Sequence, residues 1–146
     1  MYNDAKKTIE WLNSKGVKNE KIFLYGESLG SGVAVDLGLA NNFKGIILES
    51  PFTSIEKAAK KIYPFLPVKY LLKDKYDSES KIKKIKVPIL ILHGEKDRIV
   101  PFDMGMKLYN LANEPKFSYF TKDDDHMMQY NDKLLDAIKN FLNFNT

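Results

Sequence analysis

The chain has 146 residues and a mass of 16.8 kDa, with 44% hydrophobic and 29% charged residues, which is the size and composition of one globular domain. No apolar run approaches the roughly 20 residues that a membrane-spanning helix needs, and the polar N-terminus shows no secretory signal. The absence of cysteine excludes disulfides, zinc–thiolate sites and a thiol nucleophile. We therefore expect a cytoplasmic protein.

The net charge is +4, yet only Arg98 among the 23 basic residues is arginine. Base-reading and phosphate-clamping sites favour the bidentate guanidinium, so we expect no nucleic-acid partner. The lysines are concentrated: residues 56–86 hold ten lysines and four acidic residues. The lysine-rich segment 57–86 leaves one alternative open, in which a basic surface contacts a membrane or a nucleic acid.

Helical and strand-like segments alternate along the chain. Amphipathic or small-residue patterns predict helices at 4–15, 29–40, 103–112 and 134–142. Apolar runs rich in strand formers predict strands at 21–25, 45–49, 87–92 and 116–120. The second and third of these strands lack polar alternation, which indicates burial on both faces. The pattern predicts an α/β fold with a mainly parallel sheet of about four strands flanked by helices.

One connection in this pattern is much longer than the others. Residues 51–86 exceed an ordinary connection of about 4–6 residues. They hold a predicted helix at 54–62, an aromatic stretch at 63–67 and a second helical piece at 68–72. We expect this insert to form a small helical cap on a single domain that spans residues 1–146.

The residues Gly26-Glu27-Ser28-Leu29-Gly30 match the pattern G-x-S-x-G between a predicted strand and a predicted helix. This is the setting of a nucleophile elbow, in which glycines let the strand and the helix pass closely. The Leu29 N–H would open the helix and point towards a developing oxyanion. The alternative is a glycine-rich turn with a solvated serine.

The chain has two histidines that could activate such a serine. Ser28, Asp97 and His126 each follow a predicted strand and occur in the order expected of a Ser-Asp-His triad. His126 is the candidate base and Asp97 the candidate acid, although a surface histidine and a turn aspartate remain alternatives. We expect His93 to be structural, and Glu49 is a fallback acid.

A run of aspartates, Asp123 to Asp125, precedes His126. No second histidine or spaced carboxylate completes a coordination set around it. We expect a solvated turn there, and neither a metal ion nor a cofactor.

These motifs resemble the α/β-hydrolase superfamily, most closely its serine aminopeptidase-like and depalmitoylase-like branch. The resemblance lies in segments 21–30, 49–54 and 88–101 and in His126. It implies Ser28 as nucleophile, Asp97 as acid, His126 as base and the Leu29 N–H as oxyanion donor. It also implies ester, thioester or amide substrates.

The resemblance covers only the C-terminal portion of that fold. The portion of the family fold not matched would carry the early strands and the loop that donates a second N–H to the oxyanion. Loss of one such donor typically costs about 10²–10³ in rate. Residues 21–25 would then form an exposed apolar edge, which invites pairing. We expect a homodimer through this edge, a complementing N-terminal fragment, or poor solubility.

Two functional hypotheses follow from this resemblance. The first is a serine hydrolase that acts on a small-molecule acyl substrate. Its substrate contacts would come from Glu27 and Phe52 beside the motifs and from Tyr63 and Phe65 in the insert. The alternative for the insert aromatics is ordinary packing inside a lid. The second hypothesis is a catalytically weak or inactive truncated hydrolase that binds an acyl ligand or a partner.

Overall fold

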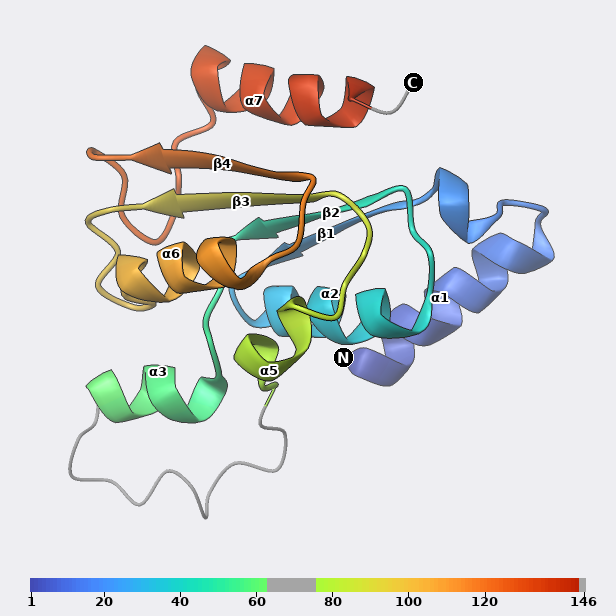
Figure 1. The fold of residues 1–146 in the computed structure, drawn as a ribbon, viewed down its shortest axis with the longest axis horizontal. Coiled ribbons are helices and arrows are strands. Elements are labelled where there is room, and N and C mark those ends of the chain that lie inside the picture. Colours follow the sequence, from blue (N-terminus) through green and yellow to red (C-terminus); the bar gives the residue numbers. More distant parts are fainter. Residues whose placement is uncertain (63–75, 145–146) are drawn as a thin grey trace.

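The computed structural model describes residues 1–62 and 76–144, without the side chains of residues 61 and 62. Its centre is a sheet of four parallel strands in the order β1-β2-β3-β4 (Figure 1). The strands are β1 (Phe23–Glu27), β2 (Gly45–Glu49), β3 (Ile89–Gly94) and β4 (Lys116–Thr121). The predicted α/β class with a parallel sheet is confirmed.

The register brings the carboxyl ends of the four strands to one edge of the sheet. Glu27 is paired with Glu49, Glu49 with Leu92, and Leu92 with Tyr119. Because parallel strands point the same way, the loops that follow β1, β3 and β4 meet at this edge.

Helices cover both faces of the sheet (Figure 1). One face carries α2 (Leu29–Ala40), α5 (Ser78–Ile82) and α6 (Phe102–Leu111), and α1 (Tyr2–Ser14) packs against α2. The other face carries α7 (Asp132–Asn143). The remaining elements are the 3-10 helix η1 (Asn19–Lys21) and the helix α3 (Ile55–Ile62).

Alternate residues of the central strands enter separate cores. Ile46 and Leu48 pack with α2 and α6 residues on one face, whereas Ile47 and Leu90 pack with Phe141 of α7 on the other. These strand residues are at most 2% exposed. Burial on both faces explains why the strands are apolar without alternation.

The boundaries differ from the sequence-based expectation in a few places. The first strand begins at Phe23 rather than residue 21, because residues 19–21 form η1. Helix α5 was not predicted, and the Asp77 carboxylate caps it by accepting a hydrogen bond from the Ser80 N–H. Of the two adjacent leucines in the last helix, Leu134 is fully buried whereas Leu135 is 37% exposed. The second helical piece predicted at 68–72 lies outside the described residues.

No helix in the described part of the chain is both long and apolar enough to span a bilayer. The cytoplasmic location stays a prediction.

Candidate active site

Ser28 occupies a sharp turn between β1 and α2. Its backbone φ is 48° and its ψ is −115°, a left-handed conformation that is costly for a residue with a side chain. The strand and the helix approach so closely here that a Cβ on Gly26 would lie 2.5 Å from the carbonyl oxygen of Gly30. The glycines of the motif therefore fit the strand–turn–helix geometry of a nucleophile elbow.

Three side chains from separate loops form a chain of hydrogen bonds. The Nε2 atom of His126 lies 3.1 Å from the Ser28 Oγ, and its Nδ1 lies 2.8 Å from the Asp97 Oδ2. An ionised carboxylate only accepts, so the Nδ1–H of His126 donates to Asp97. The Nε2 lone pair is then free to accept the Ser28 proton. The Asp97 side chain is fully buried, and that of His126 is 13% exposed.

The Asp97 carboxylate is held by four donors. Its Oδ1 accepts hydrogen bonds from the backbone N–H groups of Ile99 and Val100, each at 2.8 Å. Burial by itself raises the pKa of this carboxyl, but the hydrogen bonds from His93, His126 and the two N–H groups outweigh it. Together they lower the pKa of Asp97 to about 2. The group is thus held in its ionised form.

His93 is the fourth donor, and it is completely buried. Its Nε2 lies 2.9 Å from the Val100 carbonyl oxygen and 3.2 Å from the Asp97 Oδ2. Both are acceptors, so Nε2 carries the proton. The Nδ1 has no hydrogen-bond partner among residues 1–62 and 76–144, and a Cβ on Gly105 would lie 2.1 Å from it. His93, expected only as a structural residue, also contacts the candidate acid.

The other candidate site residues are not part of this chain of hydrogen bonds. Leu29 is the first residue of α2, and Glu27 is exposed beside Ser28. Phe52 is 3% exposed and packs with Val100 and Met104 in a core cluster, and its contact with a substrate stays a prediction. The candidate substrate contacts Tyr63 and Phe65 lie outside the described residues.

Glu49, the fallback acid, does not contact His126 through its carboxylate. Its Oε2 accepts hydrogen bonds from the hydroxyl groups of Tyr25 and Tyr130. Sequence reasoning missed this cluster, because its members come from β1, β2 and the loop before α7.

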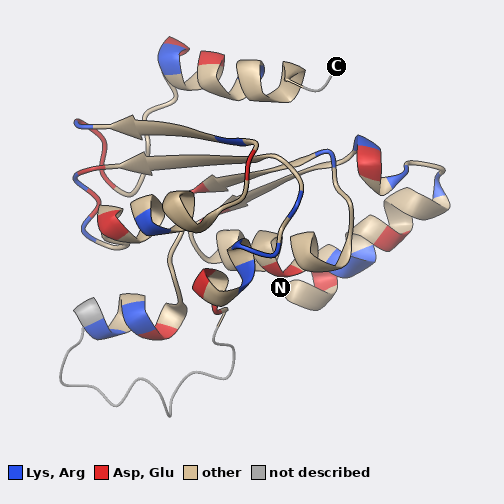
Figure 2. Ribbon diagram, viewed as in Figure 1, with Lys and Arg blue, Asp and Glu red and all other residues tan. Residues whose placement is uncertain are grey.

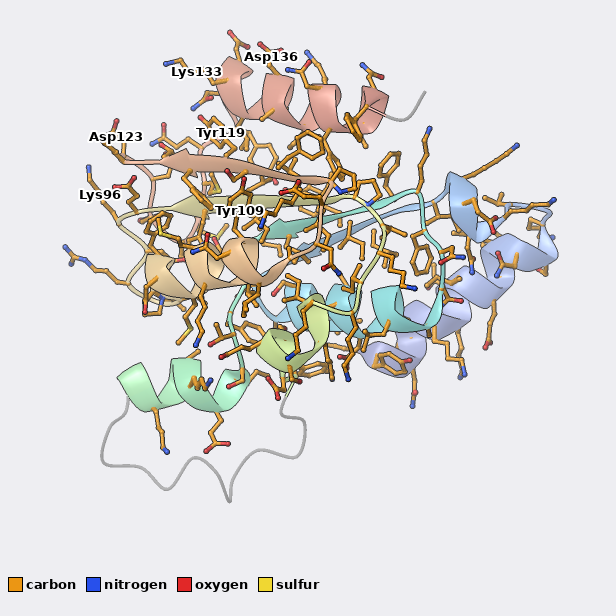
Figure 3. All side chains as sticks on the ribbon, in the orientation of Figure 1. Lys96, Tyr109, Tyr119, Asp123, Lys133 and Asp136 are labelled. Atoms are coloured by element: carbon orange, nitrogen blue, oxygen red, sulfur yellow. The ribbon has the colours of Figure 1, made fainter. Side chains whose placement is uncertain are left out.

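A cavity of about 360 Å³ opens beside His126. Its lining is mostly polar and charged, and consists of Lys96, Arg98, Ile99, Asp123, Asp124, Asp125, His126, Met127 and Gln129. Lys96 and Asp123, labelled in Figure 3 beyond the ends of β3 and β4, form an ion pair of 3.3 Å. The described residues contain no group of three or more potential metal-ligating side chains.

Comparison with known proteins gives relatives along the whole chain. Residues 1–145 match the sequence profile of the prolyl oligopeptidase family. An uncharacterized protein of Mycobacterium tuberculosis is 36% identical over 147 residues, which cover 95% of this chain and 51% of that protein. Lysophosphatidylserine lipase ABHD12 of Danio rerio is 34% identical over 134 residues, which cover 80% of this chain and 35% of that protein.

Solved structures agree with this assignment at the level of the fold. The acetyl xylan esterase from Paenibacillus sp. R4 superposes with a TM-score of 0.78 at 19% identity, over 97% of this chain and 51% of the esterase. This chain spans about half the length of the bacterial relatives it matches. The resemblance to α/β-hydrolases is confirmed: the chain belongs to the prolyl oligopeptidase family and carries part of the α/β-hydrolase fold.

Proposed function

We propose that this chain provides the nucleophile, base and acid of a serine hydrolase that cleaves acyl esters, thioesters or amides. The observation that carries the proposal is the continuous hydrogen-bond chain from the Ser28 Oγ through His126 to Asp97. The family assignment supports hydrolase chemistry.

The proposed reaction proceeds in two steps. The Ser28 Oγ attacks the acyl carbonyl while the His126 Nε2 takes its proton, and the imidazolium then gives this proton to the leaving group. Water next attacks the acyl–Ser28 ester with His126 again as base, which releases the acid and restores the serine. Asp97 holds the imidazole in the Nδ1–H tautomer and stabilises its positive charge in both steps.

The negative charge on the substrate oxygen needs donors. The Leu29 N–H stands at the N-terminus of α2, where the helix dipole favours negative charge. We expect a second donor from the part of the relatives that this chain does not cover. The leaving group must lie beside His126 to receive its proton. Since the cavity there carries both signs of charge, we expect a polar leaving group.

One edge of β1 pairs with no strand in the described part of the chain, and this edge is a docking surface in the proposal. The Ile22 carbonyl oxygen accepts a hydrogen bond from the Lys44 N–H, and the Ser28 N–H donates to the Glu49 carbonyl oxygen. The alternate residues Phe23, Tyr25 and Glu27 therefore direct their backbone groups away from β2. Next to this edge lies a mostly apolar cavity of about 360 Å³, lined by Met1, Asp4, Ala5, Leu24, Tyr25, Gly30, Val33, Ala34 and Leu37. The occupant we propose is the half of the fold that the relatives carry beyond their match to this chain.

Complementation tests this docking surface. The part of the Mycobacterium tuberculosis relative that this chain does not match, expressed separately, should form a one-to-one complex with this chain in light scattering. Ala5→Glu, which places a charge in the cavity, should weaken the complex, whereas Ala59→Glu on α3 should not. A stable homodimer that excludes the added half would contradict the choice of occupant, as would a monomer that ignores it.

Labelling with a fluorophosphonate probe, read by intact mass, tests the hydrolase function. We expect one label per chain, lost in Ser28→Ala and retained in the control Ser14→Ala. Absence of labelling in the folded chain, alone and with the complementing half, would refute the proposal. It would favour the second candidate, an inactive hydrolase that binds an acyl ligand or partner, which is motivated by the single oxyanion donor identified in the described residues.

A membrane-surface contact through the lysine-rich segment 57–86 also stays a prediction. Basic residues mark α3 and α5 (Figure 2), but Lys57 pairs with Glu79 and Lys81 with Asp36, each at 2.5 Å. If the segment binds anionic vesicles, charge reversal at Lys81, Lys83, Lys84 and Lys86 should abolish retention. Unchanged retention would remove this contact.

A further inference from the structure

Glu49 is a buried carboxylate for which the proposed reaction has no use. It ends β2 and is 2% exposed, and no cation in the described chain pairs with it. Its Oε2 accepts hydrogen bonds from Tyr25 and from Tyr130, the latter at 2.9 Å, and the two hydroxyl oxygens are 2.8 Å apart. A carboxylate is costly to bury unless hydrogen-bond donors satisfy it. The two hydroxyl groups offset this cost, but they do not explain why a carboxylate occupies this position.

The same end of β2 contacts the backbone on both sides of the candidate site. The Glu49 carbonyl oxygen accepts a hydrogen bond from the Ser28 N–H at 2.9 Å. The hydroxyl group of Ser50, which is fully buried and has a φ of 45°, donates to the His126 carbonyl oxygen at 3.1 Å. This strand end therefore lies between the nucleophile and the base.

Tyr130 extends this contact along the loop that carries His126. It lies four residues after His126 and directly before Asn131, which caps α7 by accepting from the Leu134 N–H. Between them, Met128 is 5% exposed and packs in the core under α7. The loop is thus attached at its start by Ser50, in its middle by Met128 and at its end by the bond from Tyr130 to Glu49.

We propose that Glu49 is a positioning residue that acts through Tyr130: its carboxylate fixes the loop so that the His126 Nε2 stays within reach of the Ser28 Oγ. This inference rests on the proposed function, because the distance it controls is that of the proton transfer. A small displacement of a reacting group can cost up to about 10² in rate. We expect about a tenfold loss when one of the attachments is removed.

Four variants separate positioning from general stability. Tyr130→Phe removes only the hydroxyl group, Glu49→Ala removes the acceptor, and Glu49→Gln keeps an amide oxygen that can accept in its place. Tyr109→Phe is the control, because Tyr109 belongs to α6, which covers the face of the sheet opposite to α7 (Figure 3). Tyr130→Phe and Glu49→Ala should lower the fluorophosphonate inactivation rate at saturation about tenfold. The half-saturating concentration should stay unchanged, and Glu49→Gln and Tyr109→Phe should match the wild type.

A second readout does not need a reactive serine. The His126 Nδ1–H that donates to Asp97 should give a downfield proton resonance in NMR, identified by its loss in His126→Ala. In Tyr130→Phe and Glu49→Ala this resonance should broaden or disappear, while Glu49→Gln should retain it.

The two readouts distinguish the two possible failures. If the wild type reacts with the probe, the labelling rates test the positioning role. Wild-type rates in Tyr130→Phe and Glu49→Ala then overturn it. If the wild type does not react, the proposed function fails, and an unchanged His126 resonance in these variants overturns the positioning role separately. Where Glu49→Ala does not fold, Tyr130→Phe carries the test, because it removes a single oxygen atom.

Discussion

The Asp97 carboxylate should make the stability of the protein depend on pH in acid. Its pKa is about 2 in the folded chain, against 3.8 for the unperturbed group. Because a shift of one pKa unit corresponds to about 1.36 kcal/mol, this difference in pKa contributes about 2.5 kcal/mol to the free energy of unfolding. The folded pKa is the lower one, so the unfolded chain takes up the proton first as the pH falls. The stabilisation is therefore complete above about pH 5 and is lost as the pH approaches 2.

Urea unfolding of the wild type and of Asp97→Asn at a series of pH values measures this contribution. The difference in unfolding free energy between the two proteins should shrink by about 2 kcal/mol between pH 5 and pH 2. Ser28→Ala is the control, because it alters the same site without removing a titrating group. A difference between the wild type and Asp97→Asn that stays constant over this range would refute the assignment of the ionised carboxylate to a site with four donors.

Three further substitutions test local features. Ser28→Gly relieves the strained φ of 48° and should raise the unfolding free energy by about 1 kcal/mol while abolishing labelling; a destabilised variant would contradict the strain. Gly105→Ala would place a Cβ 2.1 Å from the His93 Nδ1 and should cost about 2–3 kcal/mol in urea unfolding, so an unchanged midpoint would contradict this packing. Asn131→Ala removes the side-chain cap on the Leu134 N–H and should cost about 1 kcal/mol, with no loss expected if the cap does not form.

The sequence predicted the central sheet well because burial on both faces leaves a simple pattern. Residues 45–48 of the second strand contain no polar side chain, so their burial can be recognised without knowing their neighbours. The nucleophile elbow could also be predicted, since Gly26 and Ser28 lie two residues apart in the chain and their spacing is set by local geometry. Because β3 and β4 are parallel, the loops that follow them, with Asp97 and His126, lie at the same edge of the sheet.

The other features of the site could not be predicted, because they depend on side-chain contacts that no local sequence pattern reveals. Tyr25, Glu49 and Tyr130 are separated by up to 105 residues, and they meet only through the register of β1 with β2 and the position of the loop before α7. The role of His93 depends on which of its nitrogens faces Val100 rather than Gly105, which no spacing reveals. The burial of Phe52 was missed for a similar reason: it follows a strand end near the motifs, and only its packing with Val100 and Met104 shows that it belongs to a core cluster.

The described residues supply all three side chains of the candidate triad, but only one candidate donor for the oxyanion. The candidate nucleophile, base and acid follow three of the four parallel strands, so the sheet brings their loops to one edge, where hydrogen bonds join the three side chains. In the proposed reaction, oxyanion stabilisation depends on a pair of donors, of which the Leu29 N–H is the candidate among the described residues. A missing donor is worth about 2.7–4 kcal/mol of transition-state stabilisation, while the proton-transfer geometry is unaffected. The chain alone should therefore react with a fluorophosphonate about 10²–10³ times more slowly than the complemented protein, with the same dependence on Ser28 and His126.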